Sequence, residues 1–455
     1  MPLILGTNSI KDTGYNVANS LRVDRNSSAY LTRNESQDQS DGKKITISIW
    51  FKLGAQLGST RYFFGGHADG SYTNEIGITS NDQLNFSCIA NGTNQVTTNR
   101  VFRDTSAWYH VVAVLDSTQG TDTNRIKLYV NGVQETSFAS SSYPSENAVT
   151  EYLKNGGVTR VGDKGSGGNN WDGYLTEVCV LDGQALDQNS FGEFDEDSPF
   201  IWKPKSVSGL TFGNNGFYLD FEDSSNLGND VSGNNSDFSS NNLAATDQST
   251  DTCTNNFATM NPLIFESSSV TFSEGNLKMT TTGSGSWTTH YGLSTIAVSS
   301  GKWFVEAKVT TTQTSQSIIG ILSTSQQINS SLKDVGRAAV ERAGRKTVFG
   351  ANNQTGLTTF NDGDIAAIAF DADNGTAQFY RNGSTYGSAI TSIPRDEYYF
   401  ATNTFESGGV VEFNFGSPPF SISTGNADGN GYGNFEYSVP SNYYALNTKN
   451  LAEYG

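Results

Sequence analysis

The sequence contains little cysteine, little basic charge and no long apolar run. Its 455 residues include only three cysteines, Cys88, Cys179 and Cys253, which lie far apart and form no CxxC motif. A sparse, odd set of this kind argues against a disulfide framework and against a zinc site. We therefore interpret the three cysteines as small, semi-buried apolar residues.

Basic residues are outnumbered, because 28 Lys and Arg face 46 Asp and Glu and leave a formal net charge of −18. Such a chain is not expected to bind nucleic-acid phosphates, nor to be drawn to an anionic membrane surface. No window approaches the roughly eighteen apolar residues of a membrane span, so no membrane insertion is expected. The first residues, 1–6, lack the basic and apolar regions of a signal peptide, which predicts folding in the cytoplasm.

What the chain has in abundance is aromatic residues together with Gly, Ser, Thr and Asn. Aromatics make up 12% of the residues and glycines number 48, whereas prolines number only 9. Disordered chains are poor in aromatics, and this mixture is typical of short strands joined by polar turns. The composition predicts an all-β protein, and the length predicts two or three domains.

Strand patterns fill the first two hundred residues. The side chains of residues 45–53 (ITISIWFKL) alternate, with Ile45, Ile47, Ile49 and Phe51 on one face. The strand pattern at residues 126–130 leads into Asn131-Gly132. This pair is a strong hairpin signal, because both central residues of a type I′ turn need positive φ. The strands expected here are residues 45–53, 108–115, 126–130 and 171–181, followed by a short helical turn at 185–191.

Residues 205–262 differ in composition and are rich in Asn, Ser, Asp and Gly, with one strand-like segment at 217–221. Their aromatics argue against a free linker, so we expect an ordered connector that packs against one neighbouring domain. Strand patterns return from residue 263, and residues 421–455 are expected to pack on this second sandwich. The strands expected here are residues 301–309, 365–370, 377–381 and 410–415.

Residues 332–346 (LKDVGRAAVERAGRK) carry the one convincing helical pattern, although Gly336 and Gly344 weaken it. The stretch also gathers basic residues in an acidic chain. We interpret it as a solvated face, and contact with an acidic neighbour is the alternative.

A local pattern occurs twice. A strand runs into Asp116, a polar turn, a second strand and Asn131-Gly132, and the same order recurs with Asp371 and Asn382-Gly383. The recurrence predicts two sandwiches of related architecture, without a true sequence repeat.

These segments carry resemblances to known families. The first region resembles the laminin G-like, concanavalin-A-like lectin family, and the second is similar to SPRY domains. The resemblance implies an all-β protein with two concanavalin-A-like or jelly-roll antiparallel β-sandwiches, at residues 1–204 and 263–420. The motifs are residues 45–53, 108–116, 127–133 and 171–186 for the first family, and 301–309, 363–371, 379–383 and 413–416 for the second.

The pairing of these two domains resembles tail-fibre-like or capsid-decorating proteins of tailed bacteriophages, marine ones (cyanophage type) especially. It implies a non-enzymatic virion protein that binds host cell-surface carbohydrate through its loops. One alternative is a capsid decoration or head fibre that contacts other virion proteins, and another is a polysaccharide-degrading glycoside hydrolase. Because such virion proteins are often trimeric, the resemblance also implies a homo-oligomer, taken as a trimer.

A hydrolase would need two carboxylates across a cleft. Residues 193–197 (EFDED) and 219–223 (LDFED) come nearest. The first segment follows a helical turn and lies at a module end instead of mid-strand, and the second has the same weakness, so we interpret them as solvated acidic turns. His110 lies in an apolar strand and is expected at the edge of the core. His67 and His290 have no neighbouring ligand of the kind that a metal site needs.

Glycan binding needs rim loops that combine aromatic rings with Asn or Asp side chains. Tyr72 with Asn74, and Asn169 with Asn170, are therefore the candidate ligand-binding residues. The adjacent Trp171 fits the family's core position better than a sugar platform.

Laminin G-like modules often bind calcium at one rim through Asp and backbone oxygens, so the resemblance implies Asp69 and Asp163 as candidate calcium ligands. No other cofactor is expected. Residues 426–431 (NADGNG) are similar to part of an EF-hand loop but start with Asn and lack the closing Glu at the twelfth position, so we expect a turn there.

Overall fold

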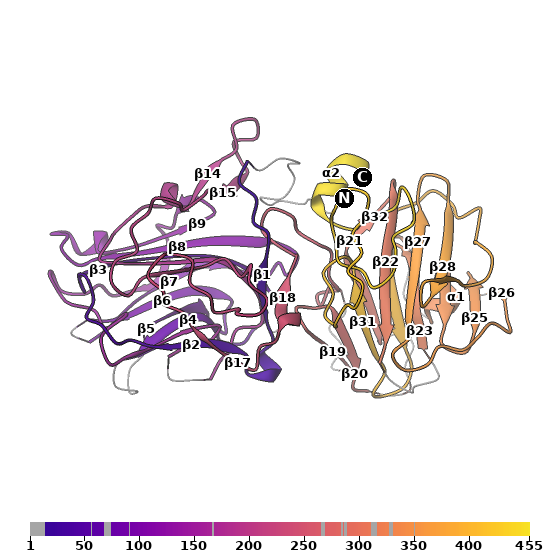
Figure 1. Cartoon of the computed structure of the whole chain (residues 1–455), viewed down its shortest axis with the longest axis horizontal. Coiled ribbons are helices and arrows are strands. Elements are labelled where there is room, and N and C mark those ends of the chain that lie inside the picture. Colours follow the sequence, from indigo (N-terminus) through magenta and orange to yellow (C-terminus); the bar gives the residue numbers. More distant parts are fainter. Residues whose placement is uncertain are drawn as a thin grey trace. The chain divides into compact units, whose positions relative to one another are not determined.

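The computed structural model describes residues 14–55, 57–67, 74–90, 92–165, 168–264, 269–283, 285, 289–310, 316–326, 331–349 and 351–455 (Figure 1). The described residues fall into two compact units, which we call the first unit (14–254) and the second unit (255–455). Their regular secondary structure is nearly all strand, and the predicted all-β fold of antiparallel sandwiches is confirmed.

The first unit packs two antiparallel sheets face to face. Sheet A contains β1 (Ser20–Val23), β3 (Lys44–Leu53), β8 (Trp108–Asp116), β9 (Ile126–Val130), β10 (Val133–Gln134), β13 (Gly173–Asp182), β16 (Phe217–Leu219) and β18 (Gln248–Ser249). Its order is β10-β9-β8-β3-β13-β1-β18, with β16 paired to β13.

Sheet B lies across the core from sheet A. It contains β2 (Tyr30–Asn34), β4 (Arg61–His67), β5 (Asn74–Ile78), β6 (Gln83–Ile89), β7 (Thr93–Val101), β11 (Phe138–Ser141), β12 (Val158–Val161) and β17 (Ser239–Asn241). Its order is β11-β7-β6-β5-β4-β12-β2-β17. The remaining elements of this unit are the hairpin β14 (Gly192–Phe194) and β15 (Trp202–Pro204) and the short 3-10 turns η1 (Arg25–Ser27), η2 (Asp122–Asn124), η3 (Gln188–Ser190) and η4 (Ala245–Asp247).

The core of the first unit fills the space between the two sheets. The alternation of β3 was predicted correctly, because its inward residues Ile47, Ile49 and Phe51 are fully buried there with Phe64 and Phe86 of sheet B. Apolar side chains from alternate positions of both sheets thus supply the hydrophobic stabilisation. All three cysteines are free and buried, as expected.

The outer face of sheet A is covered as well, by the β14–β15 hairpin and the chain that follows it as far as Phe212. Trp50, Trp108, Tyr174 and Trp202 form one buried cluster there. His110 is stacked on Trp50 at 4.6 Å, its Nδ1 accepts from Trp202 Nε1 at 2.9 Å, and its Nε2 faces Ser48 Oγ at 2.9 Å. Burial lowers the pKa of His110 to about 3, so the ring is neutral and structural.

The second unit is also built from two sheets. One contains β19 (Val270–Ser273), β20 (Lys278–Thr281), β22 (Lys302–Val309), β27 (Ile365–Asp371), β28 (Thr376–Arg381), β29 (Ser384–Thr385), β31 (Val410–Asn414) and β32 (Tyr444–Ala445). Its order is β19-β20-β31-β22-β27-β28-β29, and β32 pairs in parallel with β22.

The other sheet runs in the order β21-β30-β23-β24-β25-β26. Its strands are β21 (Tyr291–Val298), β23 (Gln316–Ser323), β24 (Ala338–Glu341), β25 (Arg345–Val348), β26 (Ala351–Gln354) and β30 (Tyr398–Thr404), and the helices of this unit are α1 (Leu332–Val335) and α2 (Thr448–Tyr454). Within the described part of the chain, neither helix nor any other has the length and apolar character needed to cross a bilayer.

Both predicted Asn-Gly hairpins are present and are built alike. Asn131 and Gly132 have φ of 47° and 78°, and Asn382 and Gly383 have 46° and 76°, as type I′ turns require. Each Asn side chain also accepts a backbone N–H from the start of a neighbouring strand, His110 at 2.7 Å and Ile365 at 2.8 Å. The recurrent sequence pattern therefore marks the same local structure in the two units.

The helix predicted for residues 332–346 is wrong. Helix α1 covers only Leu332–Val335, and the rest forms β24 and β25. Gly336 leaves the helical conformation with ψ 144°, and Gly344 turns the chain between the two strands with φ +79°. The basic residues are partly paired, Arg342 with Asp362 and Arg345 with Glu341, each at 2.8 Å.

The segment predicted as a connector belongs to the first unit as far as residue 254. Three of its short strands join the sandwich, with β16 on β13, β17 on β2 and β18 on β1. The predicted division at residue 204 therefore differs from the structure, because the strands that complete both sheets come after it.

Candidate functional site

A bulge in β13 places a carboxyl group on the covered outer face of sheet A. Thr176 pairs with Trp50 and Cys179 with Ser48, so two residues, Glu177 and Val178, oppose one residue of β3. Glu177 has a φ of +50°, a left-handed conformation that is strained for a side chain other than glycine. Val178 still points to the core, so the bulge turns Glu177 to the opposite face. Strain of this kind is often found at functional sites.

The Glu177 carboxyl is held by two tyrosines that are distant in sequence. Tyr218 Oη in β16 donates to both carboxylate oxygens at 2.9 Å, and Tyr15 Oη donates to Oε2 at 3.3 Å. The two phenolic oxygens lie 3.2 Å apart. Glu177 is only 5% exposed and forms no ion pair with any described residue.

The protonation of this cluster is set mainly by burial. Loss of solvation raises the pKa of Glu177 to about 7, the tyrosine hydrogen bonds lower it in part, and the nearby Asp220 and Glu222 raise it further. Burial and the Glu177 charge raise the pKa of both Tyr15 and Tyr218 above the usual range, so both stay protonated as donors. The carboxyl therefore titrates near neutral pH while its partners do not.

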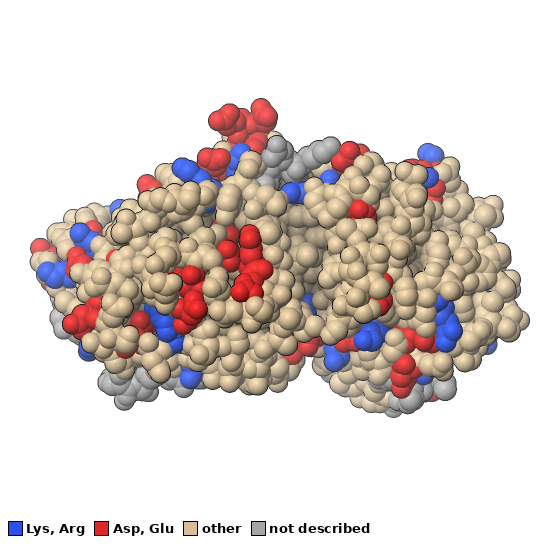
Figure 2. Space-filling model, viewed as in Figure 1, with Lys and Arg blue, Asp and Glu red and all other residues tan. Residues whose placement is uncertain are grey.

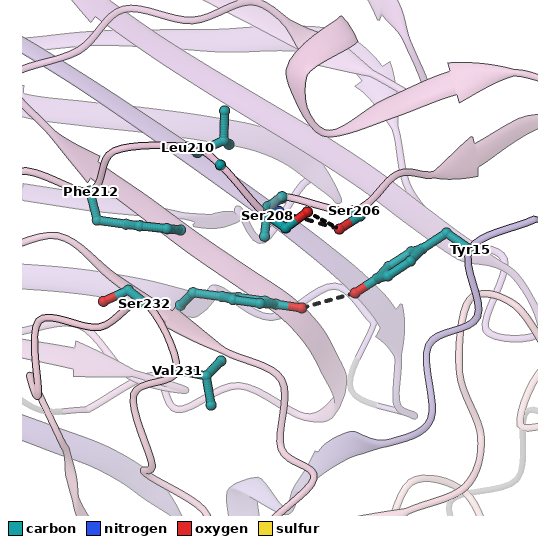
Figure 3. Close-up of a pocket in the computed structure, with 10 residues that line it drawn as sticks. Tyr15, Ser206, Ser208, Leu210, Phe212, Val231 and Ser232 are labelled. Carbon is teal, nitrogen blue, oxygen red and sulfur yellow. Dashed lines mark hydrogen bonds between the residues drawn. The ribbon is translucent and has the colours of Figure 1, made fainter.

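A half-open cavity of about 330 Å³ lies against these tyrosines (Figure 3). Tyr15 and Tyr218 form part of its wall, and Phe212 lies parallel to Tyr218 with ring centroids 6.3 Å apart. Hydroxyl groups of Ser206, Ser208 and Ser232 supply polar lining. The cavity thus combines aromatic faces with hydroxyl groups, and a buried carboxyl lies behind the two phenols. We call it the Glu177 pocket.

The sequence-predicted glycan residues have other surroundings. Tyr72 lies outside the described residues. Asn74 is buried, and its Oδ1 accepts the Ile89 N–H at 2.7 Å. Asn170 is also buried, with Nδ2 donating to the Ala29 carbonyl at 3.5 Å, whereas Asn169 is only partly buried. The two buried amides have a role inside the fold, and ligand binding by these residues stays a prediction.

The two predicted calcium ligands are not seen together. Asp69 lies outside the described residues. Asp163 is 1% exposed, and its Oδ2 pairs with Arg160 Nη1 at 2.7 Å while Oδ1 has no hydrogen-bond partner in the described chain. No group of three or more His, Cys, Asp or Glu in the described ranges is placed to hold a metal. The Arg160 guanidinium already pairs with one oxygen of Asp163, which makes Asp163 less suited to bind calcium. Calcium binding stays a prediction.

The acidic segment at residues 193–197 forms the tip of the β14–β15 hairpin. Asp195 accepts the backbone N–H groups of Asp197 and Ser198 and pairs with Lys203 at 3.2 Å. Its role is therefore to build the turn. Acidic side chains gather at this tip, which stands out from the first unit (Figure 2). Phe200, beside it, is 97% exposed.

Comparison with known proteins bears on the first unit. Residues 24–190 match a laminin G family model described as the concanavalin A-like lectin/glucanases superfamily. The predicted concanavalin-A-like domain is thereby supported. The matched range contains Glu177 but neither Tyr15 nor Tyr218, so the cluster combines matched and unmatched parts of the chain. No curated protein matches the sequence.

Solved structures that are similar in part include two SPRY domains. The SPRY domain of human HERC1 shares 22% identity over 30% of this chain and 87% of that chain, with a TM-score of 0.26. The TRIM65 PSpry domain shares 11% identity over 34% of this chain and 91% of that chain, with a TM-score of 0.29. The heptameric SAP-like pentraxin from Limulus polyphemus shares 19% identity over 38% of this chain and 79% of that chain, with a TM-score of 0.26. The resemblance of the second unit to SPRY domains stays a prediction from its sequence motifs.

Sequence reasoning missed Glu177 and the two tyrosines. One signal was present, because Glu177 is the single charged residue among the apolar residues of YLTEVCVL (174–181). A charge inside a buried strand needs a partner. The partners could not be predicted from the local sequence, because Tyr15 is 162 residues and Tyr218 is 41 residues away in the chain.

Proposed function

We propose that this chain is a non-enzymatic virion protein that binds host surface glycans, with the Glu177 pocket as a binding site. The observation that supports the proposal is the pocket lining, in which three aromatic rings and three serine hydroxyls surround a cavity of about 330 Å³. Sugars present apolar C–H faces and many hydroxyls, so aromatic rings with hydrogen-bonding groups suit them. The concanavalin A-like match of residues 24–190 adds support, because that superfamily is described as lectins and glucanases.

The arrangement of acids favours binding over hydrolysis. Glycoside hydrolases use two carboxyl groups on either side of the scissile bond, roughly 5 to 10 Å apart. The described residues that line the pocket include no Asp or Glu, and Glu177 reaches it only through the hydroxyls of Tyr15 and Tyr218. The location on a virion, by contrast, rests on the resemblance to phage tail-fibre-like and decoration proteins alone.

The test is a glycan array followed by calorimetry on the hits, with one variant that fills the pocket. Ser208→Trp places a large ring in the cavity, and Ser224→Trp makes the same change at an exposed residue outside it. We expect Ser208→Trp to weaken binding at least ~10-fold and Ser224→Trp to leave it unchanged. New reducing ends released from host polysaccharide by the purified protein would contradict a non-enzymatic function.

A second candidate function is protein contact within a virion, and the β14–β15 hairpin favours it. Phe200 is 97% and Phe194 40% exposed, and exposed aromatics of this kind often mark interaction sites. We propose in addition a homotrimer, which sedimentation equilibrium would show as three times 49.0 kDa. Labelling the protein in intact particles would distinguish a capsid decoration from a tail protein. Phe200→Ser is expected to reduce its incorporation if the hairpin is the contact.

A further inference from the structure

We propose that the Glu177 pocket selects sugars that carry a free, protonated amine over neutral or acidic sugars. This inference rests on the proposed glycan binding and specifies the ligand class of the same site. It follows from the charge and hydrogen-bond direction of the cluster formed by Glu177, Tyr15 and Tyr218.

The first argument is uncompensated negative charge. Glu177 forms no ion pair with any described residue, and the carboxylates that raise its pKa, Asp220 and Glu222, add further negative charge. Asp220 and Glu222 likewise form no ion pair in the described chain, and the Asp220 carboxylate accepts the Glu222 N–H at 3.1 Å. The pocket therefore lies in a field that attracts a cation and repels an acidic sugar.

The second argument is the direction of the hydrogen bonds. An ionised Glu177 takes the hydroxyl protons of both tyrosines, at 2.9 Å from Tyr218 and 3.3 Å from Tyr15. The Tyr218 oxygen, 3.2 Å from the Tyr15 oxygen, then has only lone pairs left for a ligand. A ligand with N–H donors fits this wall, and a charged ammonium forms the stronger, charge-assisted bond.

The third argument is the aromatic lining. The faces of Tyr218 and Phe212, parallel and 6.3 Å apart between centroids, belong to the same cavity. Aromatic faces attract ammonium groups, and the attraction grows when water is excluded. The Glu177 carboxyl, the phenolic oxygen and the aromatic rings thus all favour an ammonium group.

The experiment compares four probes at pH 7.5 by NMR titration: glucosamine, N-acetylglucosamine, glucose and glucuronate. We expect glucosamine to bind at least ~10-fold more tightly than N-acetylglucosamine, in line with one charge-assisted contact. Glu177→Gln should reduce that ratio to within ~2-fold. Glu196→Gln, which removes the same charge from the exposed hairpin tip, should leave it unchanged.

A second variant keeps the test valid if Glu177→Gln alters the fold. The double variant Asp220→Asn and Glu222→Gln changes only residues outside the core, and it should lower the glucosamine preference by ~2- to 3-fold. Equal binding of glucosamine and N-acetylglucosamine by the unmodified chain would overturn the inference and leave glycan binding intact. If none of the four sugars, nor any array glycan, bound, the proposed function itself would fail.

Discussion

At the scale of residues, two buried glutamates have similar titration but different surroundings. Burial raises the pKa of both Glu177 and Glu306 to about 7. Glu177 accepts only hydroxyl groups, which can rotate. Glu306 accepts the backbone N–H groups of Tyr437 at 2.9 Å and Glu436 at 3.0 Å, and the Asn414 side chain at 3.0 Å. At pH 5 the replacement of Glu306 by glutamine should therefore destabilise the chain, whereas the replacement of Glu177 should not.

For Glu177→Gln we expect a gain in stability that appears only as pH rises. The folded-state pKa lies above the unfolded one, so between about pH 4.5 and 7 the folded chain binds an extra proton relative to the unfolded chain, and its stability falls as pH rises through that range. The loss amounts to about 3 kcal/mol at pH 8, whereas glutamine does not titrate. Urea unfolding of both proteins at pH 5 and pH 8 measures the difference. An equal difference at the two pH values would contradict the assignment.

For Glu306→Gln we expect destabilisation at pH 5, where the pKa of about 7 keeps the Glu306 carboxyl protonated in the folded chain. The amide has one acceptor oxygen in place of two, so its NH₂ group would face a backbone N–H that now lacks an acceptor. A buried donor left in this way costs about 1–3 kcal/mol. Circular dichroism during urea unfolding gives the change. A variant as stable as the unmodified chain at pH 5 would show that the Glu306 hydrogen bonds contribute little.

At the scale of elements, the β14–β15 hairpin is fixed through Trp202 to the tight turn between β9 and β10. A Cβ atom added to Gly132 would lie 2.2 Å from Cε3 of the buried Trp202 ring, and one added to Gly192 would lie 2.5 Å from Cζ2. These two glycines therefore let the indole reach His110, to which its Nε1 donates. The hairpin is held at its base while its tip is exposed.

We expect Gly132→Ala to destabilise the first unit by about 3 kcal/mol or more, from strain and overpacking together. Gly156→Ala is a matched control, because Gly156 has the same φ of +78° with open space around it. It should cost only about 1 kcal/mol, the price of the left-handed conformation. Thermal unfolding compares the two variants. Similar losses would show that Trp202 yields without strain.

Elements whose pattern is local could be predicted from the sequence. The alternation of 45–53 and the Asn131-Gly132 turn were predicted correctly because the face to which a strand residue points and a positive φ are set by neighbouring residues. The helix at 332–346 failed because tertiary pairing of β24 with β23 outweighed its propensity. Glu177 was missed for a related reason, since its environment depends on contacts with distant segments.

At the scale of the whole molecule, the first unit is completed by chain that follows residue 204. Phe217, Leu219 and Phe238 belong to its main core. Asp251, in the same late segment, pairs with the buried Lys52 at 2.7 Å and accepts from Trp108 Nε1 at 3.0 Å. Removal of this segment would both expose apolar core and take the Asp251 carboxylate away from the buried Lys52.

We therefore expect residues 1–254 to fold as an isolated fragment and residues 1–204 to fail, although both contain the segment matched by the laminin G family model, residues 24–190. Losing three buried apolar side chains costs about 1.5–3 kcal/mol each, and a broken buried ion pair adds about 3–5 kcal/mol. That sum is comparable to the whole stability of a typical domain. Dispersed amide NMR signals should appear only for the longer fragment. A well-dispersed spectrum from residues 1–204 would show that β16, β17 and β18 decorate a sandwich that is already complete.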